Sequence, residues 1–224
     1  MKKATLTKNE KITQSAPTDK RRGLLIVFEG LDGAGKSTQV KMLANHMREK
    51  YKRAVVELSE PTKESDAGIA IRESIENKRR LDPIIEATFF IEDRRYDVQK
   101  RILPALKKNK TVVLDRYYFS TIAYQSALGI PPEELYEMQM NFIIEPDLVF
   151  ILHCPIGVAS KRINERGEQD VMEQSDYQVR VDEIFRGFTS DHMFHIEADK
   201  PIDEVHAEIV EKTDTFIKNN KIFL

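Results

Sequence analysis

Residues 30–37 are Gly-Leu-Asp-Gly-Ala-Gly-Lys-Ser, which places glycines, a lysine and a hydroxyl at the spacing G-x-x-x-x-G-K-[ST]. Glycines let backbone N–H groups turn inward around phosphate oxygens, and a helix that begins at the lysine points its positive end at the same anion. In such a loop, Lys36 reaches the β- and γ-phosphates and Ser37 offers its hydroxyl to Mg²⁺. The residues from Gly30 to Thr38 are therefore predicted to bind a nucleoside triphosphate.

A strand must deliver this loop and a helix must follow it, and the flanking sequence predicts both. Residues 24–29 form an apolar run typical of a strand. Residues 38–50 carry apolar side chains at the i, i+3, i+4 and i+7 positions of one helical face, namely Val40, Leu43, Ala44 and Met47. This context favours a phosphate-binding loop over a plain glycine turn between core elements.

A second motif, VVLDRYYFSTIAYQ at residues 112–125, places Asp115 and Arg116 directly after an apolar run. The run at 111–114 is typical of a buried strand, and in open α/β sheets ligands gather at the carboxyl ends of the strands. Asp115 is predicted to bind Mg²⁺, directly or through water, and Arg116 is predicted to face an anion. An arginine beside such an aspartate indicates a second phosphate-bearing substrate rather than water as the nucleophile.

Three more apolar runs predict strands at residues 54–58, 148–153 and 193–196. Helical patterns fill the long interval at residues 68–108. Strands that are apolar on both faces are typical of a parallel sheet covered by helices on both sides. We therefore predict one α/β domain over residues 23–224, with a five-stranded parallel sheet flanked by helices.

The composition excludes several classes of protein. A hydrophobic fraction of 41%, a charged fraction of 32% and a net charge of −2 fit a domain with a core, and they do not favour nucleic acid as a partner. The single cysteine, Cys154, excludes a disulfide framework and a multi-cysteine zinc site, and its apolar surroundings predict a core position. No uncharged apolar stretch approaches the ~18–20 residues of a membrane span, so a cytoplasmic setting is expected.

The first 22 residues differ from the rest, with seven Lys or Arg against two Asp or Glu and almost no large apolar side chains. Such a composition predicts a disordered basic tail at residues 1–22. The segment has neither an apolar signal core nor an arginine-rich amphipathic pattern, so no targeting role is predicted.

Six segments follow one another in an order typical of one enzyme family: FEGLDGAGKSTQ, SEPT, FFIEDRR, DRYYFSTIAYQ, PDLVFIL and RINERGEQDVME. From Gly23 to about Asp199 the sequence resembles the thymidylate kinases, which transfer the γ-phosphoryl group of ATP to dTMP. The resemblance implies the P-loop NTPase fold, a homodimer, and binding of ATP by the whole phosphate loop. The residues of that loop are Gly30, Leu31, Asp32, Gly33, Ala34, Gly35, Lys36, Ser37 and Thr38.

The resemblance also implies a dTMP site. Phe90 and Arg94 resemble a pair that stacks on thymine and bonds its O4, and their four-residue spacing places them on one face of a helix. Asp32 resembles a carboxylate beside the acceptor and its metal, Arg116 and Arg72 resemble phosphate clamps, and Tyr124 resembles a ring under the sugar. The full implied set is Asp32, Arg72, Phe90, Arg94, Arg116, Ser120, Thr121, Tyr124 and Gln125. Without the resemblance, Phe90 would be assigned to the core and Arg94 to a solvated charged face.

A lid is predicted at residues 160–173, SKRINERGEQDVME, where a charged stretch with a glycine follows the fourth predicted strand; a solvated helix surface is the alternative. Some family members carry a basic residue in the slot of Gly33, and this chain resembles the branch whose lid supplies catalytic arginines instead. The implied catalytic set is Asp32, Lys36, Arg116, Arg162 and Arg166. The adenine is expected near Ala198-Asp199.

A phosphate monoester acceptor has a second pKa of about 6, so it is mostly a dianion at pH 7 and needs no general base. Two alternatives stay open. One is a kinase for another nucleoside monophosphate or for a deoxynucleoside, with Glu29 as the candidate base, and the other is a nucleotide-gated binding protein without transfer activity. Arg94 only donates hydrogen bonds, so it suits O4 of thymine or uracil and opposes the amino group of cytosine. The expected preference is dTMP, then dUMP, with CMP and purine monophosphates poor.

Overall fold

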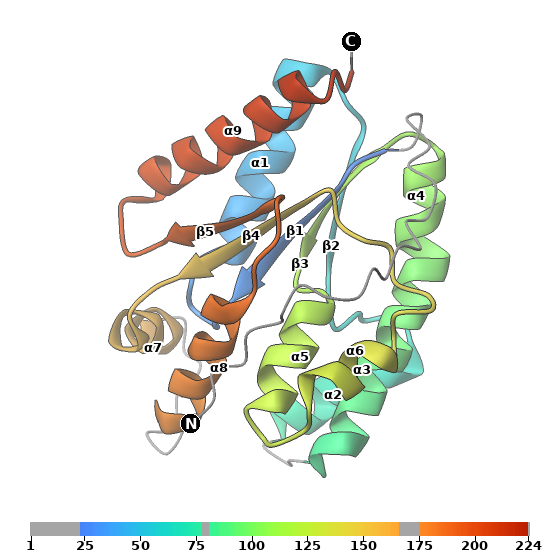
Figure 1. The fold of residues 1–224 in the computed structure, drawn as a ribbon, viewed down its shortest axis with the longest axis vertical. Coiled ribbons are helices and arrows are strands. Elements are labelled where there is room, and N and C mark those ends of the chain that lie inside the picture. The colour runs from blue at the N-terminus through green and yellow to red at the C-terminus, as the bar shows by residue number, and fades with distance from the viewer. Residues whose placement is uncertain (1–22, 78–80, 166–174, 224) are drawn as a thin grey trace.

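Five parallel strands form the central sheet of the computed structural model, which describes residues 23–77, 81–165 and 175–223. Their order across the sheet is β2-β3-β1-β4-β5 (Figure 1), and every pairing is parallel. The strands are β1 (Leu25–Gly30), β2 (Val55–Ser59), β3 (Thr111–Asp115), β4 (Leu148–His153) and β5 (Met193–Glu197). Because all five run in one direction, their carboxyl ends meet at one edge of the sheet.

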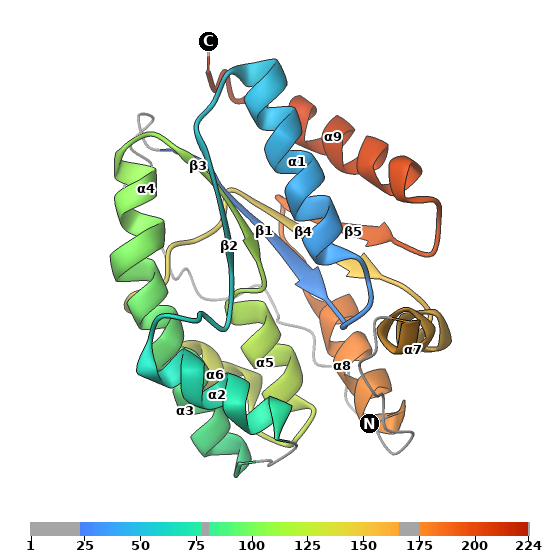
Figure 2. The same ribbon diagram turned by 180° about the vertical axis from the view of Figure 1, so that it is seen from behind.

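Helices cover both faces of this sheet (Figures 1 and 2). Helices α1 (Lys36–Tyr51) and α9 (Ile202–Asn219) pack on one face. The other helical elements are α2 (Asp66–Glu76), α3 (Pro83–Asp97), the π-helical turn η1 (Val98–Ile102), α4 (Leu103–Lys107), α5 (Tyr118–Ser126), α6 (Pro132–Glu137), α7 (Ile156–Glu165) and α8 (Ser175–Gly187). Within the described ranges, no helix is both long enough and apolar enough to cross a membrane.

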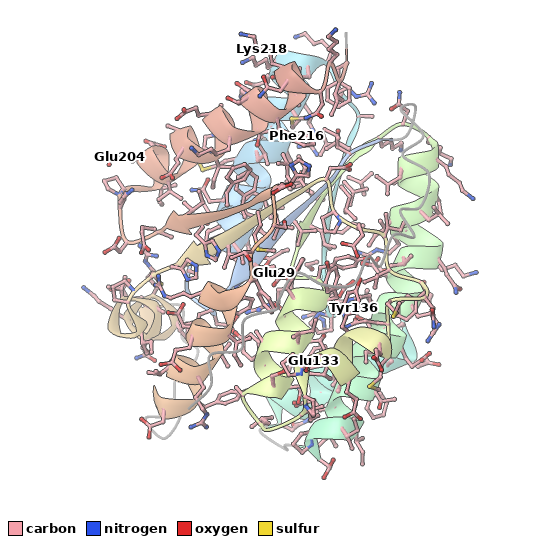
Figure 3. The ribbon with its side chains drawn as sticks, in the orientation of Figure 1. Glu29, Glu133, Tyr136, Glu204, Phe216 and Lys218 are labelled. Carbon is pink, nitrogen blue, oxygen red and sulfur yellow. The ribbon has the colours of Figure 1, made fainter. Side chains whose placement is uncertain are left out.

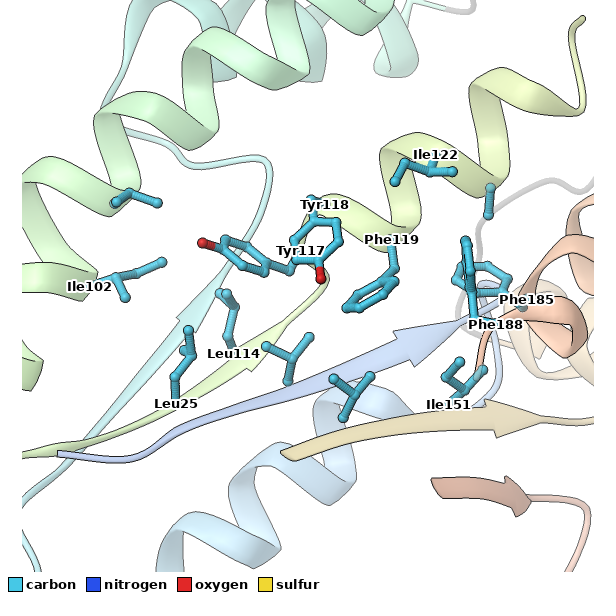
Figure 4. Close-up of a cluster of buried hydrophobic side chains, with 14 of the residues drawn as sticks. Leu25, Ile102, Leu114, Tyr117, Tyr118, Phe119, Ile122, Ile151, Phe185 and Phe188 are labelled. Carbon is cyan, nitrogen blue, oxygen red and sulfur yellow. The ribbon is translucent and has the colours of Figure 1, made fainter. Parts of the chain in front are cut away.

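The central strand β1 contributes to two hydrophobic cores because its side chains alternate between the faces of the sheet. Leu25 and Val27 belong to the core under η1, α4, α5 and α8, whereas Ile26 and Phe28 belong to the core under α1 and α9. In the first core, aromatic side chains of α5 and of the end of α8 lie against the sheet (Figure 4), namely Tyr118, Phe119, Phe185 and Phe188. The loop after β1 therefore has a base that is packed on both sides.

The predicted strands agree with the observed ones to within one residue at each end. Burial on both faces is confirmed for β1, β3 and β4, but it is wrong for β2 and β5, which are mostly half-buried or exposed. These two strands lie at the edges of the sheet, where one side has no neighbouring strand. The predicted core position of Cys154 is confirmed.

The carboxyl edge of the sheet brings the two predicted motifs together. Strand β1 pairs with both β3 and β4, and Phe28 lies opposite Asp115 in the register of β1 and β3. Gly30, where the phosphate loop begins, lies opposite Leu152 on β4. The loop and Arg116 therefore leave the sheet side by side.

Candidate active site

The loop between β1 and α1 has the backbone shape that its glycines predict. Gly30 and Gly33 have φ angles of +125° and +79°, which L side chains rarely adopt. A Cβ atom at Gly30 would lie 2.2 Å from the carbonyl oxygen of Leu152, and one at Gly33 would lie 2.4 Å from that of Ala159 on α7. The backbone of α7 thus excludes a basic side chain at residue 33.

Lys36, the first residue of α1, is buried with 5% of its surface exposed. Its Nζ atom donates hydrogen bonds to the carbonyl oxygens of Gly30 at 3.0 Å and of Leu31 at 2.8 Å. Burial lowers the pKa of Lys36 and the nearby Arg116 lowers it further, whereas Asp32 opposes the shift. The ammonium group lies inside the curve of the loop, where an anion held by the loop amides would meet it.

Ser37 and Asp115, the two predicted metal ligands, come from different elements and touch. Ser37 Oγ donates to Asp115 Oδ2 at 2.5 Å. Among the described residues Asp115 Oδ1 is buried without a hydrogen-bond partner, and a hydroxyl beside such a carboxylate oxygen is a ligand set that suits a hard cation such as Mg²⁺. No group of three or more His, Cys, Asp or Glu side chains in the described part of the chain forms a complete metal site. An ion here would therefore need phosphate or water oxygens as its remaining ligands.

Arg116 turns back from the end of β3 toward the phosphate loop, with a left-handed φ of +69°. Its guanidinium group donates to Asp32 Oδ1 at 2.7 Å, to Ser120 Oγ at 2.9 Å and to Tyr124 Oη at 3.3 Å. Burial lowers the pKa of Arg116, but Asp32 and the other acidic groups around it outweigh this, so the pKa lies well above its ordinary value. The structure thus brings three of the predicted site residues, Asp32, Ser120 and Tyr124, together around the permanent cation of Arg116.

Arg94 lies inside the protein on α3 with only 1% of its surface exposed, so the solvated charged face that its neighbours in the sequence would favour without the family resemblance is not its position. Its Nη2 and Nε atoms lie 2.7 and 2.8 Å from Glu60 Oε2. Nη1 donates to Gln139 Oε1 at 2.6 Å, and Nη2 donates to Thr121 Oγ1 at 3.1 Å. The three hydrogen bonds use one N–H group on each nitrogen, and Nη2 also forms an ion pair with Glu60. Among the described residues the second Nη1 hydrogen has no hydrogen-bond acceptor, so it can serve a further one.

Glu60 and Gln139 both hold Arg94 but are not among the residues predicted from the sequence. Burial raises the pKa of Glu60 to about 8, with the Arg94 guanidinium opposing the rise. Glu60 Oε1 is buried and has no hydrogen-bond partner in the part of the chain that the structure describes. The SEPT segment contains Glu60 and was the available signal. Gln139 has no comparable signal, because it follows the short helix α6 in a stretch that matches no motif.

Three other predicted residues lie around these groups. Arg72 donates to the carbonyl oxygen of Thr62 at 3.1 Å and to that of the preceding proline, so it holds the segment after β2. Gln125 donates to Glu86 Oε2 at 2.8 Å. Phe90 is only partly buried, and neither hydrophobic core includes it.

Arg162 on α7 lies between the phosphate loop and the segment after β5. Its Nη1 atom donates to the carbonyl oxygen of Gly33 at 3.3 Å, and both terminal nitrogens donate to that of Ala198 at 3.2 and 3.1 Å. Arg162 therefore joins the loop to the predicted adenine region. Arg166, the remainder of the predicted lid to residue 173 and the predicted tail lie outside the described residues.

These observations define the class of the protein first. A parallel sheet whose central strand leads through G-x-x-x-x-G-K-[ST] into a helix is a P-loop NTPase fold. The family model described as thymidylate kinase matches residues 28–209. The chain belongs to the thymidylate kinase family.

Individual relatives agree with this result. The chain is 41% identical over 202 residues to the thymidylate kinase of Brachyspira hyodysenteriae, which covers 90% of the chain and 96% of the relative. It is 38% identical over 198 residues to the thymidylate kinase of Desulfotalea psychrophila, with coverage of 88% and 96%. Among solved structures, the thymidylate kinase of Ehrlichia chaffeensis superimposes with a TM-score of 0.68 and 28% identity, covering 85% of the chain and 98% of that structure.

Proposed function

We propose that this protein transfers the γ-phosphoryl group of ATP to dTMP and so forms dTDP. The observation that carries the proposal is the position of Arg116. It extends from the end of β3 beside the phosphate loop, where it bonds Asp32, Ser120 and Tyr124. A cation at the mouth of a triphosphate site fits the phosphate of a second anionic substrate, and the match to the thymidylate kinase family supports dTMP as that substrate.

The phosphate loop from Gly30 to Thr38 is the proposed ATP site. Its amides and the N-terminus of α1 would hold the phosphates, and Lys36 already points into the loop. Arg162 and Ala198 mark the proposed adenine side, and Arg162 is a proposed catalytic residue together with Arg166. We propose that Ser37 and Asp115 would hold Mg²⁺ there, and the ion would supply positive charge to neutralise the phosphates.

The proposed dTMP site lies between α3 and α5. Arg116, Asp32 and Tyr124 would surround the phosphate and sugar, and Phe90 would face the thymine ring. Arg94 would donate its remaining Nη1 hydrogen to O4 of the base. Because the guanidinium only donates hydrogen bonds and is already fixed by its buried partners, it would reject the amino group of cytosine. Arg72, Ser120, Thr121 and Gln125 complete the proposed set.

The chemistry then depends on cancelling repulsion between two anions. A phosphate dianion is already a nucleophile, but two like charges about 5 Å apart repel by roughly 3 kcal/mol at an effective dielectric constant near 20. Several such pairs would keep the substrates apart. Lys36 and Arg116 supply positive charge on either side of the reacting phosphates, so positioning and electrostatic stabilisation are the main contributions of the protein.

One observation weakens the alternative of a deoxynucleoside kinase. That activity needs a base to take the proton of a 5′-hydroxyl group, and Glu29 was the candidate. Glu29 has no exposed surface, and its carboxylate oxygens accept hydrogen bonds from the backbone of Tyr117 and from Ser120. A carboxylate in these contacts is not aimed at a substrate hydroxyl.

A coupled assay of ADP release tests the proposal with dTMP, dUMP, CMP, AMP and thymidine as acceptors. We expect dTMP to be the best substrate, with kcat/KM for dUMP roughly 10- to 100-fold lower, because one methyl group contributes about 1–3 kcal/mol. CMP and AMP are expected to react poorly. A preference for thymidine would assign the protein to the deoxynucleoside kinases, and ATP binding without dTMP-dependent ADP formation would assign it to the binding proteins.

We also propose that two copies of the chain associate through α2 and α3. Ile69 and Ile75 on α2 are 41% and 57% exposed, and Ile84 and Ile85 on α3 are 40% and 49% exposed. The two helices lie side by side, away from α1 and α9 (Figure 2). A grouped apolar surface of this kind marks a protein–protein interface. A cytoplasmic location of this dimer stays a prediction.

Replacing Ile75 and Ile85 together by glutamate is expected to convert a dimer into a monomer, because it would bury like charges in the interface. Size-exclusion chromatography with light scattering measures the mass. Ile202→Glu is the matched control, because Ile202 is also 57% exposed but lies on α9. A wild-type monomer, or a double variant that stays dimeric, contradicts the proposed interface.

A further inference from the structure

Glu29, near the end of β1, is a fully buried carboxylate beside the start of α5 (Figure 3). Its Oε1 atom accepts hydrogen bonds from the backbone N–H groups of Tyr117 at 2.8 Å and of Ser120 at 3.3 Å. Tyr117 is the N-cap residue of α5, and its side chain makes no capping hydrogen bond. Glu29 therefore caps α5 from another element of the fold.

The second carboxylate oxygen leads to Arg116. Glu29 Oε2 accepts a hydrogen bond from Ser120 Oγ, and Ser120 Oγ accepts one from Arg116 Nη1 at 2.9 Å. A hydroxyl group has a single proton, so donation to Glu29 leaves its lone pairs for Arg116. The carboxylate orients the serine hydroxyl, and the hydroxyl orients the guanidinium.

We infer that Glu29 is a positioning residue for phosphoryl transfer, which holds α5 and, through Ser120, directs the Arg116 guanidinium at the acceptor phosphate. The inference rests on the proposed function, in which Arg116 binds the dTMP phosphate. Capping alone does not explain a carboxylate here, because a serine, threonine or asparagine at residue 117 would cap α5 without burying a charge. The hydrogen bonds from Glu29 through Ser120 to Arg116 explain why a buried carboxylate is needed at residue 29.

The groups around Glu29 set the pH range in which it acts. Burial raises the pKa of Glu29 to about 7, while the Ser120 hydrogen bond and the charges of Arg116 and Arg94 oppose the rise. Lys36 on α1 also faces the carboxylate. The carboxylate form is therefore present above about pH 7 and is lost as the pH falls through that value. The hydrogen bonds that orient Arg116 are expected to weaken as the pH falls through about 7. Because the folded pKa lies above the 4.5 of an ordinary glutamate, the protonated form stabilises the fold below about pH 4.5, and this stability is lost as the pH rises through about 7.

Glu29→Gln tests the inference because it keeps the side-chain shape and an oxygen for the Tyr117 N–H group but removes the charge. At pH 8 we expect kcat for dTMP to fall roughly 10- to 100-fold, as for a displaced substrate clamp, with KM for ATP unchanged. We expect Tm at pH 8 to stay equal or to rise, because a buried charge has been removed. Between pH 8 and pH 6, kcat of the wild type should fall more than kcat of the variant. Ionisation of the dTMP phosphate affects kcat of the wild type and of the variant equally, so the difference between the two pH profiles reports the ionisation of Glu29.

Ser120→Ala removes the bridge to Arg116 but leaves the backbone N–H groups of α5 for Glu29. We expect it to lower kcat in the same way as Glu29→Gln. The double variant should be no worse than the more impaired single variant, because both changes act on one guanidinium group.

Asp214→Asn is the control for a loss of stability alone. Asp214 accepts hydrogen bonds from His46, Lys50 and Tyr51 between α1 and α9, at the end of α1 opposite Lys36. We expect a lower Tm with unchanged kcat.

If the wild type is active and Glu29→Gln has the same kcat at pH 8, the inference is overturned. It is also overturned if the fold-losses in kcat of Glu29→Gln and Ser120→Ala multiply in the double variant. A lowered Tm in Glu29→Gln with the same pH profile as the wild type would give Glu29 a structural role only, and would also overturn it. An inactive wild type would instead overturn the proposed function, so the two failures are distinguishable.

Discussion

Replacing Arg116 by alanine is expected to lower kcat for dTMP phosphorylation by about 10³-fold while ATP binding stays near that of the wild type. Arg116 lies beside the phosphate loop and bonds Asp32, so it faces the proposed acceptor phosphate rather than the donor. Lys36 and the loop amides, which would hold ATP, do not depend on its side chain. Steady-state kinetics and isothermal titration with a non-hydrolysable ATP analogue measure the two effects.

The conservative variant Arg116→Lys sharpens this prediction. Lysine keeps the charge but cannot bond Asp32, Ser120 and Tyr124 together as the planar guanidinium does. We expect it to recover only a small part of the lost kcat. Turnover near that of the wild type in Arg116→Ala would show that the acceptor phosphate binds elsewhere.

Replacing Arg94 by alanine is expected to raise KM for dTMP about 100-fold and to lower the free energy of unfolding by about 3 kcal/mol. The first effect follows from losing the proposed donor for O4 of the base. The second follows because Glu60 would remain buried without its partner, and breaking a buried ion pair leaves an uncompensated charge. Because burial raises the pKa of Glu60 to about 8, the loss of stability should be larger at pH 8 than at pH 6.

Two further variants separate these effects. Arg94→Ala combined with Glu60→Gln should recover much of the stability but none of the affinity for dTMP. Arg95→Ala is the matched control, because Arg95 is the next residue on α3 but its side chain is 40% exposed and pairs only with exposed Glu92 at 3.3 Å among the described acidic groups. It should leave KM unchanged. An unaltered KM in Arg94→Ala would remove Arg94 from the base site.

Features of the fold that depend on local periodicity could be predicted from the sequence. The phosphate loop and the five strands follow from runs of residues whose neighbours along the chain define them. The hydrogen bond between Arg116 and Asp32 of the loop does not, because it depends on β3 lying next to β1. The edge positions of β2 and β5 do not follow, since their apolar composition resembles that of the central strands and only the strand order exposes them.

Arg94 shows how much of the candidate site could not be predicted from the sequence. Its neighbours Glu92 and Arg95 are exposed and give this turn of α3 the composition of a surface. Its burial depends on two acceptors, Glu60 and Gln139, which lie 34 and 45 residues away along the chain. Partners at such separations leave no periodic pattern, so the family resemblance identified Arg94 but the fold was needed to find what holds it.

Arg116 also constrains how this enzyme can be engineered. At φ +69° an L side chain costs roughly 1–2 kcal/mol, which glycine avoids. Glycine at residue 116 would remove this strain but also the hydrogen bonds to Asp32, Ser120 and Tyr124, so selection for heat resistance at this position would sacrifice both those contacts and turnover. Engineering for thermal stability should therefore keep Arg116 unchanged and substitute residues on the face of the sheet that α1 and α9 cover.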